Sequence, residues 1–340
     1  MKKVVWVISD GVAGHYNQSK GCVLALEQLF DVQVEWVELK LRFGLLRKGL
    51  RYLLNQHGQI NLSVLEWCYQ CTHWPQAAPD LVIGAGGKVM YAVAALARQH
   101  GVPSIFMGSL RGLKPALFHT VLVLEQYPEP QYLTVETAPM PISSQALTAA
   151  ADAWQAEHPT ETGELWAMLI GGDGAGASYS EQDWQQLAIA MNHLAQEHHI
   201  RWLITTSRRT GHAAEDMLKH TLYPEVVADQ VWWSEAPRKV MTAFLGRAQL
   251  VCCTVESMSM LTEAIVAQRP VIGLIPQQFS PEDAYQQAIH RLMNRRWLAT
   301  QPIETWTTQH LAHQEQLKPM RQSALQQLAL QLKTRLMNDL

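Results

Sequence analysis

The chain has 340 residues, more than one ordinary domain core holds, and this length predicts two domains of roughly 150 residues each. Hydrophobic residues make up 48% of the chain and charged residues 17%, which is typical of a globular protein and excludes a disordered one. The formal net charge of −3 lacks the surplus of Lys and Arg that duplex binding requires. Nucleic acid is therefore not an expected partner.

The cysteines indicate a reducing compartment. They are odd in number and lack a disulfide-like spacing, so we expect free thiols and a cytoplasmic location. The apolar run at residues 4–8 is too short for a signal peptide and predicts a buried strand. No segment approaches the roughly 20 apolar residues of a membrane span. The five cysteines are Cys22, Cys68, Cys71, Cys252 and Cys253.

Short β-branched runs alternate with helical patterns through the first half of the chain. This alternation predicts a parallel sheet with helices on both faces. We place a first, acceptor-side Rossmann-like domain at residues 1–157. Its expected strands are 4–8, 32–39, 81–83, 103–107 and 121–124, and its clearest helices are 18–30 and 89–99.

A polar stretch with Pro and Gly at residues 157–163 predicts a domain boundary. The pattern then restarts as a second doubly wound α/β domain, expected at residues 164–310. Beyond about Pro281 the pattern predicts helix to the end, with a helical segment at 311–340. The expected strands of this half are 166–170, 202–205, 231–233, 250–253 and 271–275, and its expected helices include one opened by Pro237 and one at 257–267.

Ligands of open parallel sheets bind at the carboxyl ends of the strands, which directs attention to the loops there. The loop after the first strand carries two titratable groups, Asp10 and His15, and its glycines let the backbone approach a ligand. A plain turn in which Asp10 or Asn17 caps the helix explains the loop equally well. A second glycine loop serves either a ligand or close helix packing. The acceptor-side loop residues are Gly11, Gly14, Asn17, Gln18, Gly86 and Gly87.

Two loops of the second half suit a phosphate. Gly171 and Gly172 follow a predicted strand, and their glycine spacing only approximates a dinucleotide fingerprint. The next strand ends in two arginines among three hydroxyls, and arginine binds phosphate oxygens bidentately. The alternative is a pair of surface salt bridges. The residues of this arginine loop are Ser207, Arg208, Arg209 and Thr210.

The segment after the strand at 250–253 opens a helix. Ser257 and Ser259 are expected to cap this helix and, with Met258, to share its free amides with an anionic ligand. Glu263 lies further inside the helix, where its carboxylate can accept hydrogen bonds from a ribose diol. A solvated helix carboxylate is the alternative. Phosphate at the helix start and an acid for the sugar together predict a nucleotide site.

Three motifs, in the same order from residue 1 to about residue 300, resemble the mitochondrial-fission ELM family, whose bacterial members are regarded as candidate GT-B glycosyltransferases of lipopolysaccharide and other surface glycans. The layout is also similar to the lipid-linked N-acetylglucosaminyltransferase of peptidoglycan synthesis. The resemblance implies two Rossmann-like domains facing a cleft, with His15 on the acceptor side and Glu263 on the donor ribose. The motifs are Asp10-Gly11-x-x-Gly14-His15-x-Asn17-Gln18, Ser207-Arg208-Arg209-Thr210 and Thr254-x-Glu256-Ser257-x-Ser259-Met260-x-x-Glu263-Ala264.

The chain departs from the family pattern at three places. Glu256 stands where the family usually has Asp, the segment 124–127 replaces a Pro-x-His-Asp type segment, and the segment 236–238 replaces Asn-Pro-Tyr. The second change removes an acid–base pair, and the third touches the expected base pocket. The catalytic base therefore stays open between His15 and Asp10, and the nucleotide stays open too.

The resulting hypothesis is a transferase that moves a sugar from a nucleotide-sugar to a glycan or lipid-linked acceptor. Arg208, Arg209, Ser257 and Ser259 are assigned to the leaving phosphate. No metal cofactor is expected, since the chain has no Asp-x-Asp motif. The rivals are a nucleotide-sugar 2-epimerase, which needs no acceptor, and a non-catalytic scaffold that keeps the fold.

A stripe of apolar residues bears on the acceptor. Cations flank the stripe, which suits either contact with the anionic inner leaflet or a buried core helix with a solvated side. With leaflet contact, the acceptor is a lipid-linked glycan. The stripe is Leu39, Phe43, Leu46, Leu50, Leu53 and Leu54, and the cations are Lys40, Arg47, Lys48 and Arg51.

Overall fold

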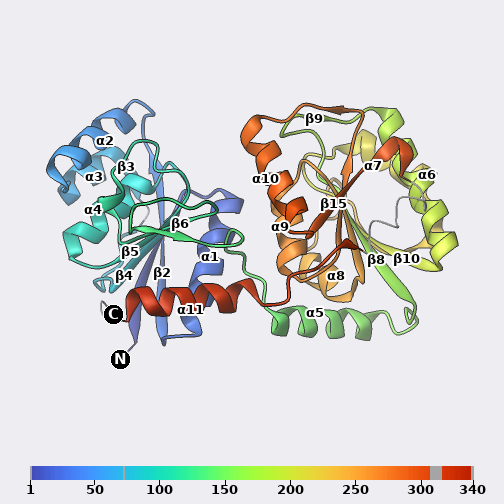
Figure 1. The fold of residues 1–340 in the computed structure, drawn as a ribbon, viewed down its shortest axis with the longest axis horizontal. Coiled ribbons are helices and arrows are strands. Elements are labelled where there is room, and N and C mark those ends of the chain that lie inside the picture. The colour runs from blue at the N-terminus through green and yellow to red at the C-terminus, as the bar shows by residue number, and fades with distance from the viewer. Residues whose placement is uncertain (1, 72, 307–315, 338–340) are drawn as a thin grey trace. The chain divides into compact units, whose positions relative to one another are not determined.

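A computed structural model describes residues 2–71, 73–306 and 316–337 (Figure 1). The chain forms two compact units. The N-terminal unit comprises residues 1–141 and 324–340, and the C-terminal unit comprises residues 142–323. Each unit is built on its own twisted, mainly parallel sheet, as the alternating pattern predicted.

The N-terminal unit has strands β1 (Lys3–Ser9), β2 (Val32–Leu41), β3 (Tyr69–Cys71), β4 (Leu81–Ala85), β5 (Ser104–Met107), β6 (Thr120–Val123) and β7 (Tyr132–Thr134). They pair in the order β3-β2-β1-β4-β5-β6-β7, all in parallel except that β3 runs antiparallel to β2. Its helices are α1 (Ala13–Glu27), α2 (Leu46–His57), α3 (Leu62–Cys68), α4 (Met90–His100), α11 (Ala324–Leu336) and the short 3-10 turn η1 (Pro115–Leu117).

The C-terminal unit has strands β8 (Glu164–Leu169), β9 (Ala177–Ser178), β10 (Ile200–Thr205), β11 (Val227–Val231), β12 (Leu250–Thr254), β13 (Val271–Ile275), β14 (Gln278–Phe279) and β15 (Leu298–Pro302). Its six-stranded sheet has the order β11-β10-β8-β12-β13-β15, and β9 pairs with β14 separately. Its helices are α5 (Ser144–Glu157), α6 (Glu181–His198), α7 (His212–Thr221), α8 (Met241–Arg247), α9 (Met258–Val266), α10 (Asp283–Asn294) and the 3-10 turns η2 (Pro224–Val226) and η3 (Ile303–Thr305).

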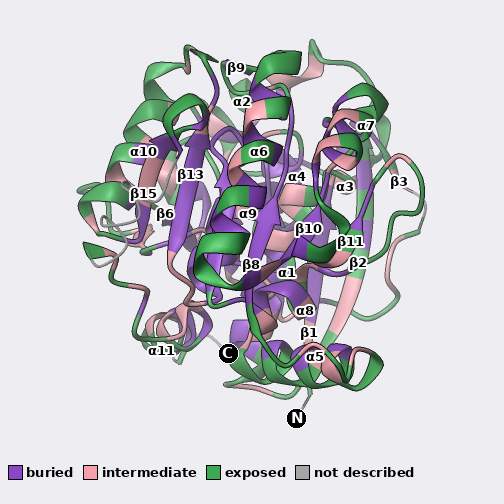
Figure 2. Cartoon of the chain, turned by 90° about the vertical axis from the view of Figure 1, so that its right-hand side faces the viewer, coloured by how far each residue is buried: buried purple, intermediate pink, exposed green. Residues whose placement is uncertain are grey.

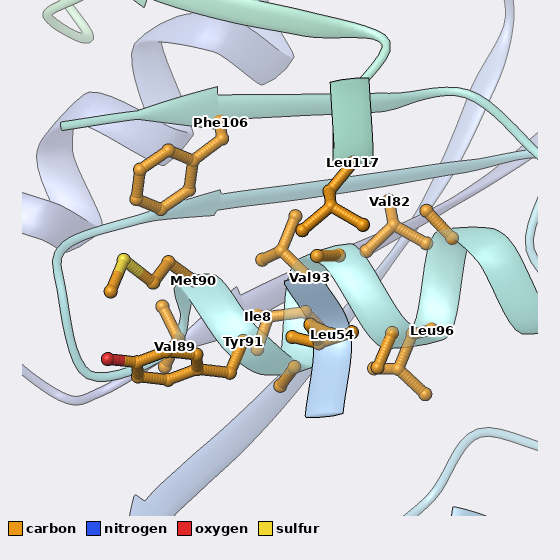
Figure 3. Close-up of a cluster of buried hydrophobic side chains, with 14 of the residues drawn as sticks. Ile8, Leu54, Val82, Val89, Met90, Tyr91, Val93, Leu96, Phe106 and Leu117 are labelled. Carbon is orange, nitrogen blue, oxygen red and sulfur yellow. The ribbon is translucent and has the colours of Figure 1, made fainter. Parts of the chain in front are cut away.

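The strands are continuous apolar runs because helices cover both faces of each sheet. Every residue of β4, β5 and β12 is buried, and Figure 2 shows the same burial along the central strands. In the N-terminal unit, Val93 and Leu96 of α4 belong to one core cluster with Ile8 and Val82 of the sheet (Figure 3). These packed cores hold the strand ends, and the loops that follow them, in fixed positions.

In each sheet the strand order reverses at one strand, so that consecutive strands are added first on one side of it and then on the other. In the N-terminal unit, β1 lies between β2 and β4. In the C-terminal unit, β8 lies between β10 and β12. The loops that leave the two sides of such a point diverge, and ligands of doubly wound sheets bind there. The loops after β1, β4, β8 and β12 therefore mark the two candidate sites.

The structure divides the chain earlier than the boundary expected at residues 157–163. Helix α5 packs against α8 and so belongs to the C-terminal unit. The C-terminal helix α11 packs against α1 and returns the chain to the N-terminal unit, where Leu325, Leu328 and Leu332 join the core (Figure 1). Part of the helical segment expected at 311–340 lies outside the described residues. Sequence patterns identify helices, but tertiary packing decides to which unit a helix belongs.

Several expectations of secondary structure were wrong. The helix expected to open at Pro237 begins at Met241, and the strand expected at 231–233 lies at Val227–Val231. The stretch beyond Pro281 contains the strand β15, which pairs in parallel with β13. The apolar stripe at residues 39–54 is not one helix, because β2 continues to Leu41 and α2 begins only at Leu46. Leu50 and Leu54 of the stripe are buried, whereas Phe43 is 65% exposed. In the described part of the chain, no helix has the length and apolar character needed to cross a membrane.

Candidate functional site

The loop after β1 holds a histidine–carboxylate pair. Nδ1 of His15 lies 3.0 Å from Oδ1 and 3.1 Å from Oδ2 of Asp10. The Asp10 side chain is 2% exposed and the His15 side chain 34% exposed. A carboxylate at Nδ1 selects the imidazole tautomer that carries its proton there, which leaves the lone pair on Nε2. The sequence predicted both residues, and the geometry gives them unequal parts: Asp10 orients the ring that His15 presents.

The loop after β4 makes room for this ring. A Cβ atom added to Gly86 would lie 2.2 Å from Nδ1 of His15, and Gly86 has a φ of +93°. Only glycine fits so close an approach in this conformation. The adjacent Gly87 is close to Arg111, because an added Cβ would lie 3.0 Å from the Nε of that arginine. The two glycine loops therefore meet at the reversal point of the sheet. The need for glycine at position 86 is explained by its packing against the His15 ring.

The remaining residues of the β1 loop lie around the pair. A Cβ on Gly11 or Gly14 would meet no atom within 4 Å. Asn17 and Gln18 lie half-buried in the first turns of α1. The alternative that Asp10 or Asn17 caps α1 was wrong, because the N-cap is Val12 and no side chain bonds the helix start. Asp10 instead accepts a hydrogen bond from the N–H of Val12 at 3.2 Å.

A pocket of about 540 Å³ opens beside Asp10 in the N-terminal unit. The ends of β1 and β2, the start of α2, the edge strand β3 and the β4 loop line it. Its size suits a small-molecule group. Three cations line this pocket: Lys40 of β2, Arg47 of α2 and Lys88 of the β4 loop.

In the C-terminal unit, a buried polar network joins the loops after β8 and β12. Thr254 accepts a hydrogen bond from the N–H of Gly171 at 2.7 Å and donates one to Glu256 at 3.1 Å. Tyr179 donates to the other oxygen of Glu256 at 2.5 Å. Burial raises the pKa of Glu256, whereas its hydrogen bonds and Arg209 act in the opposite direction. This network fixes the two loops at the reversal point.

The arginine loop after β10 is also bound into the protein. Ser207 and Thr210 both donate to the carbonyl of Gly171, and Arg209 donates to the carbonyls of Gly172 and Asp173 at 3.1 and 2.8 Å. Nη2 of Arg209 also lies 3.4 Å from Oε1 of Glu256. We expected these side chains to be available to phosphate. In the structure, Ser207, Arg209 and Thr210 instead hold the glycine loop. These partly buried contacts, called the brace below, stand in place of the surface salt bridges that were the alternative.

Gly171 and Gly172 allow their loop to pack closely against Glu256 and the arginine loop. A Cβ on Gly171 would lie 1.9 Å from Oε1 of Glu256. A Cβ on Gly172, whose φ is +114°, would lie 2.4 Å from the carbonyl oxygen of Arg209. The loop therefore needs glycine in order to lie against the brace, whether or not a ligand binds.

Arg208 differs from its neighbour. Both arginines are exposed, but no hydrogen bond or ion pair of the Arg208 side chain is found in the part of the chain that the structure describes. It is the member of the arginine pair that the brace leaves available to an anion.

Helix α9 begins at Met258, directly after the network. Ser257 is buried and occupies the N-cap, but its side chain makes no capping hydrogen bond, so the predicted serine cap was wrong. Ser259 is exposed within the first turn. The first amides of an α-helix have no partner inside the helix. In α9 the N–H of Met258 bonds to the hydroxyl of Tyr285, which donates to the carbonyl of Val255 at 2.9 Å. No partner of the Ser259 amide is found among the described residues, and the positive end of the helix dipole favours an anion there.

Glu263 lies four residues after Ser259, so both side chains project from the same face of α9. Burial raises the pKa of Glu263 from its ordinary value of 4.5 to about 7. No hydrogen bond or ion pair of its carboxyl group is found among the described residues. Glu263 is thus a desolvated carboxylate with a raised pKa and no partner among the described residues, one turn from the start of α9. A perturbed carboxylate without a structural role is a candidate for a functional site.

Sequence reasoning missed the role of several residues. Tyr179 drew no attention, since nothing in its neighbourhood predicts contact with a loop more than seventy positions away. The sequence places Arg47 among the cations beside the apolar stripe, but nothing in it brings Arg47 into one pocket with Lys88. Among the described residues, no group of three or more His, Cys, Asp or Glu side chains is placed to hold a metal ion.

Comparison with protein families gives one match. The model of the family described as mitochondrial fission ELM1 matches residues 13–318, which is most of the chain. A search of curated proteins finds no similar sequence.

Solved structures share the fold. UDP-GlcNAc 2-epimerase from Neisseria meningitidis, bound to UDP-GlcNAc, superposes with a TM-score of 0.55 at 10% identity, over 99% of this chain and 100% of that one. The S. aureus MnaA–UDP structure gives 0.53 at 12% identity, over 100% and 98% of the two chains. The calicheamicin glycosyltransferase CalG4 gives 0.51 at 12% identity, over 100% and 95%. The chain thus has the two-domain Rossmann-like fold of GT-B glycosyltransferases, and identities this low show the fold alone.

Proposed function

Because this chain belongs to the mitochondrial fission ELM1 family, we propose that it is a GT-B glycosyltransferase. It moves a sugar from a nucleotide-sugar to a glycan or lipid-linked acceptor in the synthesis of a cell-surface polysaccharide of the lipopolysaccharide type. The donor site lies at the start of α9, and the acceptor chemistry takes place at the loop after β1.

The observation that carries the proposal is the pairing of a free helix start with Glu263 on one face of α9. The amide of Ser259 at the start of α9 binds the diphosphate, and the carboxylate of Glu263 accepts hydrogen bonds from the ribose diol. One turn of helix separates the two groups, about 5 Å along the axis, which matches the spacing of a phosphate and its sugar.

Arg208 supplies the mobile positive charge for the leaving diphosphate. Arg209 does not reach it in this account, because it braces the glycine loop. Helix amides and one guanidinium stabilise the developing charge without a metal ion, which is the arrangement expected for a chain without an Asp-x-Asp motif.

His15 is the general base. Its Nε2 takes the proton of the acceptor hydroxyl, while Asp10 fixes the ring and stabilises the imidazolium that forms. Of the two residues that the sequence left open as the base, we therefore propose His15.

Two of the structural neighbours support the ligand class. The Neisseria epimerase is bound to UDP-GlcNAc and the S. aureus protein to UDP, and both share the fold over nearly the whole chain. We extend to this chain a nucleotide-sugar ligand of that class. The same likeness makes a 2-epimerase the rival, because such an enzyme needs the donor site and no acceptor.

Incubation of the full chain with radiolabelled UDP-sugars, with and without a cell-envelope glycolipid extract, tests the proposal. The transferase account predicts that label enters the glycolipid and that His15→Gln abolishes this transfer while nucleotide binding persists. Conversion of the donor sugar without an acceptor would establish the epimerase instead. No change of any donor, together with no nucleotide binding, would establish a scaffold.

A further inference from the structure

The pocket beside Asp10 collects positive charge from three elements. Lys40 comes from β2, Arg47 from α2 and Lys88 from the loop after β4. None of the three has an ion pair in the described ranges of the chain. Like charges that line one pocket repel one another, and an anionic ligand would relieve this repulsion.

Arg47 adds a second, independent observation. Its Nε atom is buried and has no hydrogen-bond partner among the described residues. A buried donor left without an acceptor costs about 1–3 kcal/mol, and most such donors in native proteins are satisfied. Burial raises the pKa of the nearby Tyr69 and the charge of Arg47 acts in the opposite direction, while the Tyr69 hydroxyl donates to the carbonyl of Lys88 at 2.7 Å. Arg47 and Lys88 are thereby linked through one buried tyrosine.

Two carboxylates also line the pocket, and they balance only part of this charge. Asp10 is bonded to His15 at the rim nearest the catalytic loop. Glu38 is exposed on β2 and has no ion pair in the described part of the chain. Three cations therefore line the pocket with two carboxylates, one of which is bonded to His15, so an excess of positive charge remains that an anionic phosphate group would balance.

We propose that this pocket binds a phosphate or diphosphate group of the acceptor, held by Arg47, Lys88 and Lys40, and so places the acceptor hydroxyl at His15. The inference rests on the proposed transferase function and names its acceptor class as a phosphorylated glycan. The volume of about 540 Å³ accommodates a diphosphate together with part of one sugar. The source of the group is either a soluble sugar phosphate or a lipid-linked glycan.

Calorimetric titration of the full chain tests the proposal with two probes. UDP is titrated first and kept saturating, so that the proposed donor site is occupied. Inorganic pyrophosphate then probes the pocket in solution, and neutral phosphatidylcholine vesicles with and without a polyprenyl diphosphate probe the lipid-linked form. Arg47→Gln is expected to weaken binding at least about tenfold, since charge-assisted hydrogen bonds contribute about 1.5–3 kcal/mol.

Controls separate a binding role from a folding role. Lys88→Gln removes a second cation of the pocket and should weaken binding even if Arg47→Gln lowers the melting temperature. Lys20→Gln removes an equal charge from the exposed face of α1, outside the pocket, and should change nothing. Pyrophosphate binding alone identifies a soluble acceptor, and vesicle binding a lipid-linked one. Binding of neither probe, or equal loss in Lys20→Gln, overturns the proposal, and UDP binding in the first titration shows separately whether the donor site stands.

Discussion

At the scale of single residues, the two neighbouring arginines have opposite parts. Arg209 donates to two loop carbonyls and approaches Glu256, whereas Arg208 is exposed and unpaired among the described contacts. Arg209→Ala should lower the free energy of unfolding by about 1–3 kcal/mol, because two loop carbonyls lose their donor and the buried Glu256 loses its ion pair. Arg208→Ala should leave stability unchanged and weaken nucleotide binding about tenfold. Urea unfolding and nucleotide titration of both variants check this, and stability loss in Arg208→Ala would contradict it.

We expect the free energy of unfolding to depend on pH through Glu263. Its pKa is about 7 in the folded chain and 4.5 when unperturbed. Between these values the folded chain holds the extra proton, so stability falls as pH rises from 4.5 and levels off above about 7. Glu263→Gln removes this loss and should stabilise the protein by about 1–3 kcal/mol on the alkaline side, with little effect on the acid side.

The same variant should bind nucleotide more weakly, because the amide cannot accept both hydrogen bonds of a ribose diol. Gain of stability with loss of binding is the expected signature of a residue retained for function. Thermal melts across pH, with and without nucleotide, measure both effects. Unchanged nucleotide affinity in Glu263→Gln would remove this residue from the donor site.

Gly86 connects backbone geometry to catalysis. Gly86→Ala places a methyl group against His15 in a strained backbone conformation, so it should abolish transfer and cost about 1–3 kcal/mol of stability. Gly14→Ala is the matched control, because its methyl group meets no atom within 4 Å and alanine favours the helix by about 1 kcal/mol. Turnover assays and unfolding curves of both variants check this. Full activity in Gly86→Ala would show that His15 is not the base.

Sequence reasoning reached part of this site. It found Asp10, His15 and Glu263 because a strand followed by polar residues and a helix start is a local pattern. It did not separate Arg208 from Arg209, since the partners of Arg209 lie more than thirty positions away along the chain. Nor could it find the link between Tyr179 and Glu256, which only the folded loops bring together.

At the scale of elements, the segment before α2 is an exposed apolar surface with adjacent cations. Phe43 and Leu45 are 65% and 83% exposed, and Arg42 and Lys48 are exposed beside them. We propose that this surface contacts the anionic inner leaflet. The double variant Phe43→Ser/Leu45→Ser should lose most of its binding to phosphatidylglycerol vesicles in a sedimentation assay.

The matched control for this surface is Leu330→Ser on α11, since Leu330 is equally exposed, at 66%. It should sediment with vesicles as the unchanged protein does. Equal binding by the double variant would show that the exposed side chains near α2 serve another purpose. The sequence located the apolar stripe but merged the end of β2 with α2, because leucines and valines at this spacing fit either element.

At the scale of the whole molecule, the sequence predicted two Rossmann-like domains because buried parallel strands leave strong apolar runs. It did not predict that α5 joins the C-terminal unit or that α11 returns to the N-terminal unit. Both helices are amphipathic surface elements, and the choice of the sheet they cover depends on contacts far apart in sequence. The short strand β15 was missed for the same reason.

The proposed chemistry needs no metal ion at the donor diphosphate, because the α9 amides and Arg208 supply the positive charge. Transfer should therefore continue unchanged after exhaustive treatment with EDTA. A loss of activity that Mg²⁺ or Mn²⁺ restores would contradict this part of the account.

The central claim is that the start of α9 binds a nucleoside diphosphate whose ribose meets Glu263. A crystal structure of the full chain with bound UDP tests it most directly. The account predicts the diphosphate within hydrogen-bond distance of the Ser259 amide, with Arg208 turned toward it and the ribose hydroxyls on the carboxylate of Glu263. A nucleotide bound elsewhere, or an empty helix start at saturating UDP, would contradict it.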